Sequence, residues 1–552
     1  MAIKRIIAAA VAVVLLVVNS GITFADVTVP GVVRVGLYYG GTAQSKFSIN
    51  AQKGISIGFV KDGIFTSMYE EPSNNNITVR KDAYYTKSGA VFTEYNPGSA
   101  APSGDKVGPF HIQLNGTFAD FNSANIQAQT YKQQGINAYP VYKDSWQLWS
   151  GFYSDQNSAQ ADIAIIQQKL GAGNYTVIQP SATRIAVNNA NGDTVLLFDS
   201  TAAFFQIHPK QENNPYIFCL NNKKSYRGNL EVRRQSGSDM TLINVLPLDQ
   251  YVYGVVPNEI ESYSNAEALK AQAVAARTYA LDNISYSKHA KWNFDVCTTT
   301  DCQVYGGYST ETAATDKAVD DTGGLKVTYN GKLAEVFFFA SDGGKTEEPK
   351  NVWGTTSSIP YLVSVDDQYE STSSSHYNWS ETVSADEIKA LTQKYGHDIG
   401  DITGVVASKY SEAGRVTELD IYGTNSVKPY ALYLNSTSSF FGLNSQMFTV
   451  SSNAGISVVS SDSTIKSIST GEISVMTANG IVKIPASQSN LTVLGANGQT
   501  KTVNAAPTAY TFTGKGWGHG VGMSQEGAKG MANAGFKFDQ ILQHYFPGTK
   551  VE

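Results

Sequence analysis

The sequence predicts an α+β protein built from several units, and three observations support this fold class. Short runs that alternate apolar and polar residues fill residues 31–95 and 181–245, which is the pattern of half-buried strands. Between these regions, segments typical of strands and helices follow the order βαββαβ over residues 109–180. After residue 245, helical segments and strands are mixed. The 552 residues predict two to four domains, and 42% hydrophobic residues are enough for real cores.

The first 25 residues have the pattern of a secretory signal peptide. Lys4 and Arg5 precede an apolar run of 13 residues, which is too short to span a bilayer comfortably. Thr23 and Ala25 stand at the small-residue positions before a cleavage point. An uncleaved membrane anchor is the alternative. We therefore expect the mature protein to be secreted, outside the cytoplasmic membrane.

The composition narrows the classes of ligand. The chain has 41 Lys and Arg residues against 47 Asp and Glu residues, and only 16% of its residues are charged. Such a chain is not suited to bind nucleic acid through phosphates. No segment matches the phosphate-loop pattern GxxxxGK[ST]. The many Ser, Thr, Asn, Gln and Tyr residues suit neutral polar ligands such as sugars.

The N-terminal part is predicted to be a β-rich region interrupted by an inserted unit. The region comprises residues 26–104 and 183–244, and residues 105–182 form the insert. A Pro/Gly/Ser-rich stretch, "NPGSAAPSGDK", precedes the insert. Within the insert, "FNSANIQAQTYKQQG" and "NSAQADIAIIQQKLG" are expected to be helices, the second capped by Asn157 or Ser158.

Two helices are expected after residue 246. Pro247 suits the first position of one helix and Pro257 is expected to end it. Ser264 and Glu267 have capping-box spacing at the start of the second. Glu259 lies between them among apolar neighbours, where partial burial would raise the pKa of its carboxyl. A general acid that protonates a glycosidic oxygen needs this property. An exposed loop carboxylate is the alternative.

A glycine at every second position marks residues 514–522. Such a segment lets a flat polar ligand or another backbone approach closely. We expect Trp517 to stack on a sugar face. His519, Ser524 and Gln525 are expected to hydrogen-bond hydroxyl and acetamido groups. The alternative is that the glycines only permit tight packing of the chain.

The insert resembles a SPOR domain, a peptidoglycan-binding module of bacterial envelope proteins. The stretch "YPVYKDSWQLWSGFYSDQNSAQADIAIIQQ" carries the resemblance. Gly151 and Phe152 end a strand before a helix whose first turns hold Ala159 or Ala161. The resemblance implies that residues 105–182 bind glycan strands stripped of peptide. A βαββαβ insertion without a ligand is the alternative.

Residues 245–552 resemble the catalytic domain of the SpoIID/LytB family, the stage II sporulation protein D and amidase-enhancer proteins. Five blocks occur in the order of the family: "LPLDQYVYGVVPNEI", "FDVCTTTDCQVYGG", "ASDGGKTEEPKNVWG", "GLNSQMFTV" and "GKGWGHGVGMSQEGA". The resemblance implies a peptidoglycan lytic transglycosylase of sporulation or wall remodelling, acting in the cell wall. Such an enzyme cleaves between N-acetylmuramic acid and N-acetylglucosamine, leaves 1,6-anhydro ends and requires no cofactor. Its catalytic acid would be Glu259. The alternative within the family is an amidase enhancer without catalytic activity, which binds glycan and stimulates an N-acetylmuramoyl-L-alanine amidase.

The cysteines depart from the pattern of the family, in which some members bind zinc with two Cys and two His. Here Asp301 precedes Cys302, where a His is often found. A disulfide between Cys297 and Cys302 is the favoured prediction for a secreted protein. Zinc held by Cys297, Cys302 and His289, with Asp301 as a weak fourth ligand, is the second possibility, and free thiols are the third. A β-rich insertion without recognisable chemistry is expected near residues 451–510.

Overall fold

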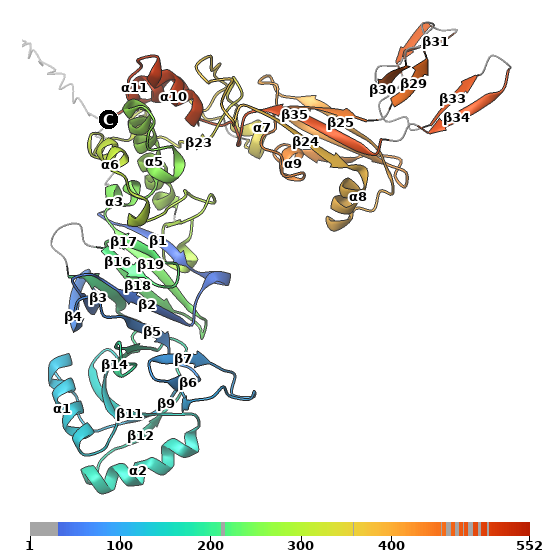
Figure 1. Cartoon of the computed structure of the whole chain (residues 1–552). Helices are drawn as coiled ribbons and strands as arrows, with labels where there is room; N and C mark the ends of the chain where they lie inside the picture. The colour runs from blue at the N-terminus through green and yellow to red at the C-terminus, as the bar shows by residue number, and fades with distance from the viewer. Residues whose placement is uncertain are drawn as a thin grey trace, which may run out of the picture.

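The computed structural model describes residues 31–210, 216–286, 288–356, 358–453 and 507–552, and short strands between residues 455 and 504. The proposed signal peptide lies outside the described residues. The α+β fold class is confirmed. Within the described residues, no helix combines the length and apolar character needed to cross a membrane. Figure 1 shows two arms that meet at a group of helices.

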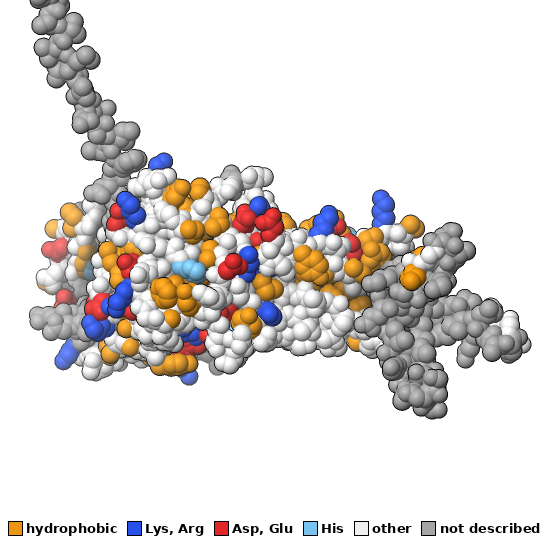
Figure 2. Space-filling model, turned by 90° about the horizontal axis from the view of Figure 1, so that it is seen from above, with side chains coloured by type: hydrophobic (Ala, Val, Ile, Leu, Met, Phe, Trp, Pro, Cys, Tyr) orange, Lys and Arg blue, Asp and Glu red, His pale blue; other side chains and the backbone are white. Residues whose placement is uncertain are grey.

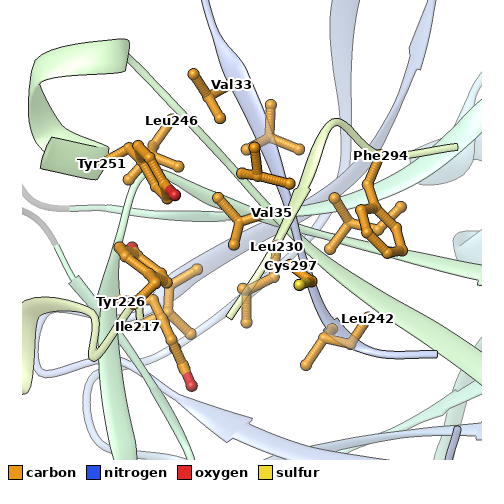
Figure 3. Packing of buried hydrophobic residues seen from close by; sticks show 14 of the residues in the cluster. Val33, Val35, Ile217, Tyr226, Leu230, Leu242, Leu246, Tyr251, Phe294 and Cys297 are labelled. Atoms are coloured by element: carbon orange, nitrogen blue, oxygen red, sulfur yellow. The ribbon is translucent and has the colours of Figure 1, made fainter. Parts of the chain in front are cut away.

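The first arm contains a seven-stranded sheet that joins distant parts of the sequence. Its two edge strands lie far apart in the sequence. One of them is the segment that carries Cys297, and it pairs in parallel with the first strand of the chain. In this pairing Val35 is opposite Val296. Figure 3 shows Cys297 among the apolar side chains of this core. In sheet order, the strands are β20 (Val296–Cys297), β1 (Val33–Tyr38), β19 (Met240–Leu246), β18 (Asn229–Arg234), β15 (Phe204–Pro209), β3 (Ile55–Lys61) and β4 (Ile64–Glu71).

The first arm also contains a ten-stranded sheet, of which the insert supplies four strands. The βαββαβ order is confirmed, with α1 (Phe121–Gln133) after the first strand and α2 (Gln156–Leu170) after the third. The assignment as a SPOR domain remains a prediction. In sheet order, the strands are β12 (Thr176–Ile178), β9 (Phe110–Gln113), β11 (Trp146–Tyr153), β10 (Ala138–Tyr142), β14 (Thr194–Phe198), β13 (Ile185–Asn188), β5 (Ile77–Lys81), β2 (Lys46–Asn50), β16 (Tyr216–Cys219) and β17 (Lys224–Arg227).

The insert is therefore not a separate sheet. Its strand β10 pairs in parallel with β14 of the flanking region, Val141 opposite Leu197. Residues 105–107 form β8 (Asp105–Val107), which pairs with β6 (Tyr85–Ser88) in a small sheet with β7 (Val91–Glu94). The cap of α2 is Asp155, whose Oδ1 accepts the Ser158 amide at 2.9 Å. The predicted caps Asn157 and Ser158 are wrong because both lie inside the first turn of the helix.

Helices meet where the two arms join, and their starts differ from prediction. Pro247 caps α3 (Leu248–Tyr253), and Pro257 lies inside the first turn of α4 (Val256–Glu259) rather than ending a helix. Proline fits there because amide groups of the first turn have no partner within the helix. The predicted capping box is also wrong: Asn265 accepts the Glu267 amide at 3.0 Å at the start of α5. The remaining elements of this group are α5 (Ala266–Tyr286), α6 (Ala313–Asp320), α10 (Gln525–Asn533), α11 (Phe538–Tyr545) and the 3-10 turns η1 (Gly40–Thr42), η2 (Ala290–Trp292) and η3 (Tyr308–Thr310).

Helix α5 is buried along most of its length. Its residues Leu269, Ala273 and Ala276 are fully in the core. Helices α6, α10 and α11 pack around it. Small side chains permit this close packing on several sides. The helix therefore fixes the positions of the segments that carry the candidate site.

The second arm has its own hydrophobic core, around Phe448 and Phe512. Among the residues that the structure describes, the β-rich insertion contains three hairpins, β29–β30, β31–β32 and β33–β34. The elements of this part and of the short connecting sheets are β21 (Val327–Tyr329), β22 (Lys332–Leu333), β23 (Phe338–Phe339), α7 (Pro349–Trp353), β24 (Asn378–Ser384), α8 (Ala385–Lys394), β25 (Ile402–Tyr410), β26 (Val416–Gly423), β27 (Tyr430–Tyr433), α9 (Ser436–Ser439), β28 (Phe448–Ser452), β29 (Gly455–Val459), β30 (Ile465–Ser469), β31 (Ser474–Thr477), β32 (Gly480–Lys483), β33 (Asn490–Leu494), β34 (Thr500–Asn504), β35 (Ala509–Lys515), β36 (Met523–Ser524) and β37 (Lys550–Val551).

Candidate active site

Glu259 is the last residue of α4 and is half-buried between helices. Its Oε1 accepts the backbone amide of Val304 at 2.8 Å, and the side chain of Gln525 hydrogen-bonds the same carboxyl. Burial raises the pKa of Glu259, and these two hydrogen bonds oppose the rise only in part. The carboxyl therefore keeps its proton to a higher pH than an exposed glutamate does. It is not the exposed loop carboxylate of the alternative prediction.

Gln525 and Ser524 have different surroundings although they are neighbours. Gln525 is buried at the start of α10, and its Nε2 lies 3.4 Å from Oε1 of Gln272 on α5. This contact directs Gln525 toward Glu259. Ser524 is fully buried and caps α10, with its Oγ accepting the Gly527 amide at 3.1 Å. The structure therefore gives the Ser524 hydroxyl a capping role.

His519 belongs to the glycine segment, and its side chain is half-buried. Its Nδ1 accepts the Val521 amide at 3.0 Å, and its ring packs against the rings of Phe339 and Trp353. Burial lowers the pKa of His519 to about 4, and the nearby Arg415 adds to this effect. The imidazole is therefore neutral at pH 7. Its hydrogen bond and ring contacts stabilise the backbone of the glycine segment.

The alternating glycines face protein atoms. A Cβ at Gly518 would lie 2.9 Å from Cβ of Phe339, and one at Gly522 would lie 2.3 Å from the carbonyl oxygen of Phe337. Just before Gly518, Trp517 exchanges two backbone hydrogen bonds with Ser341, of 2.7 and 3.0 Å. Thus the glycines allow another backbone to approach, and the packing alternative describes them better than a ligand surface.

A chain of polar contacts runs from the segment after Glu259 to Trp517. Glu261 binds the Lys529 ammonium at 2.9 Å, and Lys529 also binds Glu526 at 2.6 Å. Glu526 lies 3.3 Å from Nδ1 of His376, whose ring meets the Trp517 ring edge-on at 5.1 Å. Trp517 is 44% exposed, so its ring is open to a ligand.

Sequence reasoning missed His376, Glu526 and Lys529. The spacing of Glu526 and Lys529, three residues apart on one helical turn just after Gln525, was a usable signal. His376 stands in a Ser-rich loop and carries no such signal. Figure 2 shows that acidic and basic side chains on this face form small mixed groups.

The cysteine segment differs from the favoured prediction. Cys297 and Cys302 are free thiols, so the predicted disulfide is absent from the structure. The Sγ of Cys302 instead accepts the Cys297 amide at 3.2 Å and lies 3.1 Å from Nε2 of His289. The third thiol, Cys219, is free and buried in β16.

The same segment brings together four groups that could hold a metal ion. Ligand atoms of His289, Cys297, Asp301 and Cys302 all lie within 4.8 Å of one another. Ligand atoms in a tetrahedral zinc site lie about 3.3–3.8 Å apart, so the set fits zinc after small shifts. Lys288 also contacts Asp301, at 3.2 Å, and competes for that carboxylate. With four protein ligands, such a site would be structural.

A profile of the stage II sporulation protein SpoIID matches residues 236–329, the segment that contains Glu259 and the cysteines. An uncharacterized protein of Brachyspira hyodysenteriae is 30% identical over 312 residues, which cover 56% of this chain and 68% of that protein. This chain belongs to the SpoIID family. The stage II sporulation protein D of Bacillus subtilis is 28% identical to this SpoIID-family chain over 319 residues, or 74% of its own length.

The amidase enhancer of Bacillus subtilis is 36% identical over 306 residues, which cover 54% of this SpoIID-family protein. The matched part is only 39% of the amidase enhancer. The chain thus spans well under half of the relative whose name refers to an amidase.

Proposed function

We propose that this SpoIID-family protein is a secreted lytic transglycosylase that cleaves the glycan strands of the cell wall. The observation that supports this most is the environment of Glu259. Its carboxyl is half-buried, its pKa is raised by burial, and two hydrogen bonds hold it in one orientation. A positioned carboxyl whose pKa is raised above its ordinary value is suited to protonate a glycosidic oxygen.

One carboxyl can perform both proton transfers of this reaction. Glu259 gives its proton to the oxygen between N-acetylmuramic acid and N-acetylglucosamine as the C–O bond breaks. Positive charge develops at the anomeric carbon, as in other glycosidic cleavages. The 6-hydroxyl of the muramic acid then closes on that carbon, and the ionised Glu259 takes its proton. The Val304 amide and Gln525 stabilise the carboxylate between the two steps.

We further propose that the exposed polar side of the site binds the sugars next to the cleaved bond. Trp517 offers a partly exposed ring, and His376, Glu526 and Lys529 offer donors and acceptors beside it. Zinc held by His289, Cys297, Asp301 and Cys302 would fix the segment that follows. That segment includes Val304, two residues after Cys302, whose amide binds Glu259.

A second candidate function is that of an amidase enhancer, which binds glycan and stimulates an N-acetylmuramoyl-L-alanine amidase. The identity of 36% to a protein of that name favours it. The two candidates share the fold and the glycan, and they differ in whether this chain breaks a bond. Peptidoglycan is the expected partner in both cases.

The experiment compares the wild type with Glu259→Gln on peptide-free glycan strands, with mass spectrometry of the products. Glutamine keeps the shape and the hydrogen bonds but has no proton to transfer, so formation of anhydro ends should fall roughly 10²–10⁴-fold. Glu70→Gln, at an exposed glutamate of β4 in the first arm, is the matched control and should retain activity. Full activity of Glu259→Gln would refute the assignment. A wild type that never cleaves but accelerates an amidase would establish the second function.

A further inference from the structure

A cavity of about 680 Å³ opens where the inserted unit joins the flanking strands, far from Glu259 in the first arm. Strands β10 and β14 pair only at Val141–Leu197 and Tyr142–Phe198, so the halves of these strands before these pairs separate. Helix α1 lines the cavity from one side and the strands β6 and β7 from the other (Figure 1). The volume lies in the range typical of small-molecule sites, roughly 300–1,000 Å³.

The lining of this basic cavity is strongly positive in a chain of net charge −6. Four cationic side chains, Arg80, Lys87, Lys106 and Lys132, and one carboxylate, Asp193, line it. Asp193 acts electrostatically on Lys132. In the part of the chain that the structure describes, Arg80, Lys87 and Lys106 form no ion pair. The cavity therefore has an excess of positive charge that an anion would balance.

Arg80 provides a fixed charge in the wall. It is fully buried, its Nε donates to Oδ1 of Asn188 at 3.1 Å, and its Nη2 has no hydrogen-bond partner among the described residues. The nearby Asp82 carboxylate balances it only in part, because His111 and Arg184 bind that carboxylate too. A buried cation with an unused donor is costly unless a counter-charge is near.

The rest of the wall has the chemistry that recognises sugars. The partly exposed rings of Tyr69 and Phe121 line the cavity and offer flat apolar surfaces. The amides of Asn125 and Asn137 also line it and can donate to and accept from hydroxyl groups. A purely inorganic anion would leave these rings and amides without a role.

We propose that the basic cavity binds an acidic sugar, a saccharide that carries a carboxylate or a phosphate. Lysine ammonium groups form charge-assisted hydrogen bonds with either anion. The rings and amides contact the sugar itself. This binding site is distinct from the glycan-cleaving site and does not depend on the activity of Glu259.

The test is calorimetric titration of the full mature chain with three sugars: N-acetylmuramic acid, N-acetylglucosamine 6-phosphate and neutral N-acetylglucosamine. At least one acidic sugar should bind about tenfold more tightly than the neutral one, and its affinity should fall with added salt. The stronger acid identifies the anionic group. Equal binding of all three sugars, or binding of none, would overturn the proposal.

Variants locate the binding. The double variant Lys87→Gln/Lys106→Gln should bind the acidic sugar about tenfold more weakly, since each exposed charge pair changes affinity by up to about fivefold. Lys53→Gln, an exposed lysine outside the cavity, is the matched control and should bind as the wild type does. Trp517→Ala should also leave this binding unchanged. If Trp517→Ala abolishes binding and the cavity variant does not, the sugar binds at the candidate active site and the proposal is wrong.

Discussion

At the scale of single residues, Glu259 shows how opposing effects set a protonation state. Burial favours the neutral acid, whereas the Val304 amide and Gln525 favour the carboxylate. Because burial is the larger effect, the pKa lies above the ordinary value of 4.5. The balance leaves the proton held but available, which a general acid requires.

The pH dependence of cleavage should follow this balance. Only protonated Glu259 can act as the acid, so kcat/KM should fall as the pH rises through its raised pKa. Gln525→Ala removes a hydrogen bond that favours the carboxylate, so the pKa should rise further and the alkaline limb should move to higher pH. A pH–rate profile of both proteins checks this. A limb that stays in place or moves to lower pH would contradict it.

Trp517 and His519 are two residues apart but should respond differently to alanine. Trp517→Ala removes an exposed ring, so glycan affinity should fall about tenfold while the free energy of unfolding changes by less than about 0.5 kcal/mol. His519→Ala removes a half-buried ring and its hydrogen bond to the Val521 amide, so the free energy of unfolding should fall by roughly 1–3 kcal/mol. Glycan pull-down and urea denaturation separate the two effects. Equal loss of stability in both variants would show that Trp517 is structural.

Sequence reasoning predicted the partial burial of Glu259 and the rise of its pKa, because an acid among apolar neighbours at a helix junction is a local signal. The role of Glu259 as the acid stays a prediction. It could not predict the roles of His519 and Ser524. The residue types that bind a ligand are the same as those that hydrogen-bond the backbone of a turn. Their partners, Val521 and Gly527, are close in sequence, but only the backbone path shows that the side chains turn inward.

At the scale of elements, the glycine segment is defined by what its backbone touches. Gly522 and Gly535 both have positive φ, of 85° and 95°. Only Gly522 faces a backbone oxygen, that of Phe337, whereas a Cβ at Gly535 would meet no atom within 4 Å. Both alanine variants carry the strain of a positive φ, roughly 1–3 kcal/mol. Only one adds a steric clash.

Gly522→Ala should therefore lower the free energy of unfolding by roughly 1–3 kcal/mol more than Gly535→Ala does. Chemical denaturation of the two variants under the same conditions measures the difference. Equal values would mean that the backbone of β23 yields easily to a methyl group.

The β20 segment gives a prediction about metal. Protein produced with zinc should contain about one zinc ion per chain by mass spectrometry, and Cys297→Ser should reduce this content strongly. Removal of zinc should loosen the Val304 amide and lower glycan cleavage without abolishing glycan binding. Cys219→Ser, at the buried thiol outside the cluster, is the matched control. Full labelling of three thiols with no metal bound would contradict the zinc site.

At the scale of the whole molecule, the insert and its host share one sheet. All five residues of β10 are buried, and the edge of β10 that pairs with β14 would be bare in an isolated insert. A bare apolar edge favours association between chains. The fragment 105–182 should therefore self-associate, whereas the full mature chain, in which β10 pairs with β14 and β1 pairs with β20, should not associate through these edges. Analytical ultracentrifugation of both proteins checks this, and a monomeric, folded fragment 105–182 would refute it.

The order of elements in the insert was predictable because each helix and strand has its own periodicity. The join to β14 was not, because strand pairing depends on backbone edges that leave no trace in the pattern of side chains. The same reason explains why the parallel pairing of β1 with β20 went unnoticed. When two strands hundreds of residues apart pair with each other, the sequence of neither strand identifies its partner.

The pairing of β1 with β20 also affects how the chain is made. Arg34 donates its amide to Asp295, 261 residues later in the sequence. At a synthesis rate of about 5–20 residues per second, β1 waits roughly 13–50 s for its partner to emerge. During that interval the nascent sheet has an open edge on which another newly made chain can add. A factor that shields this edge during export would raise the yield of folded protein more than one that acts on the completed chain.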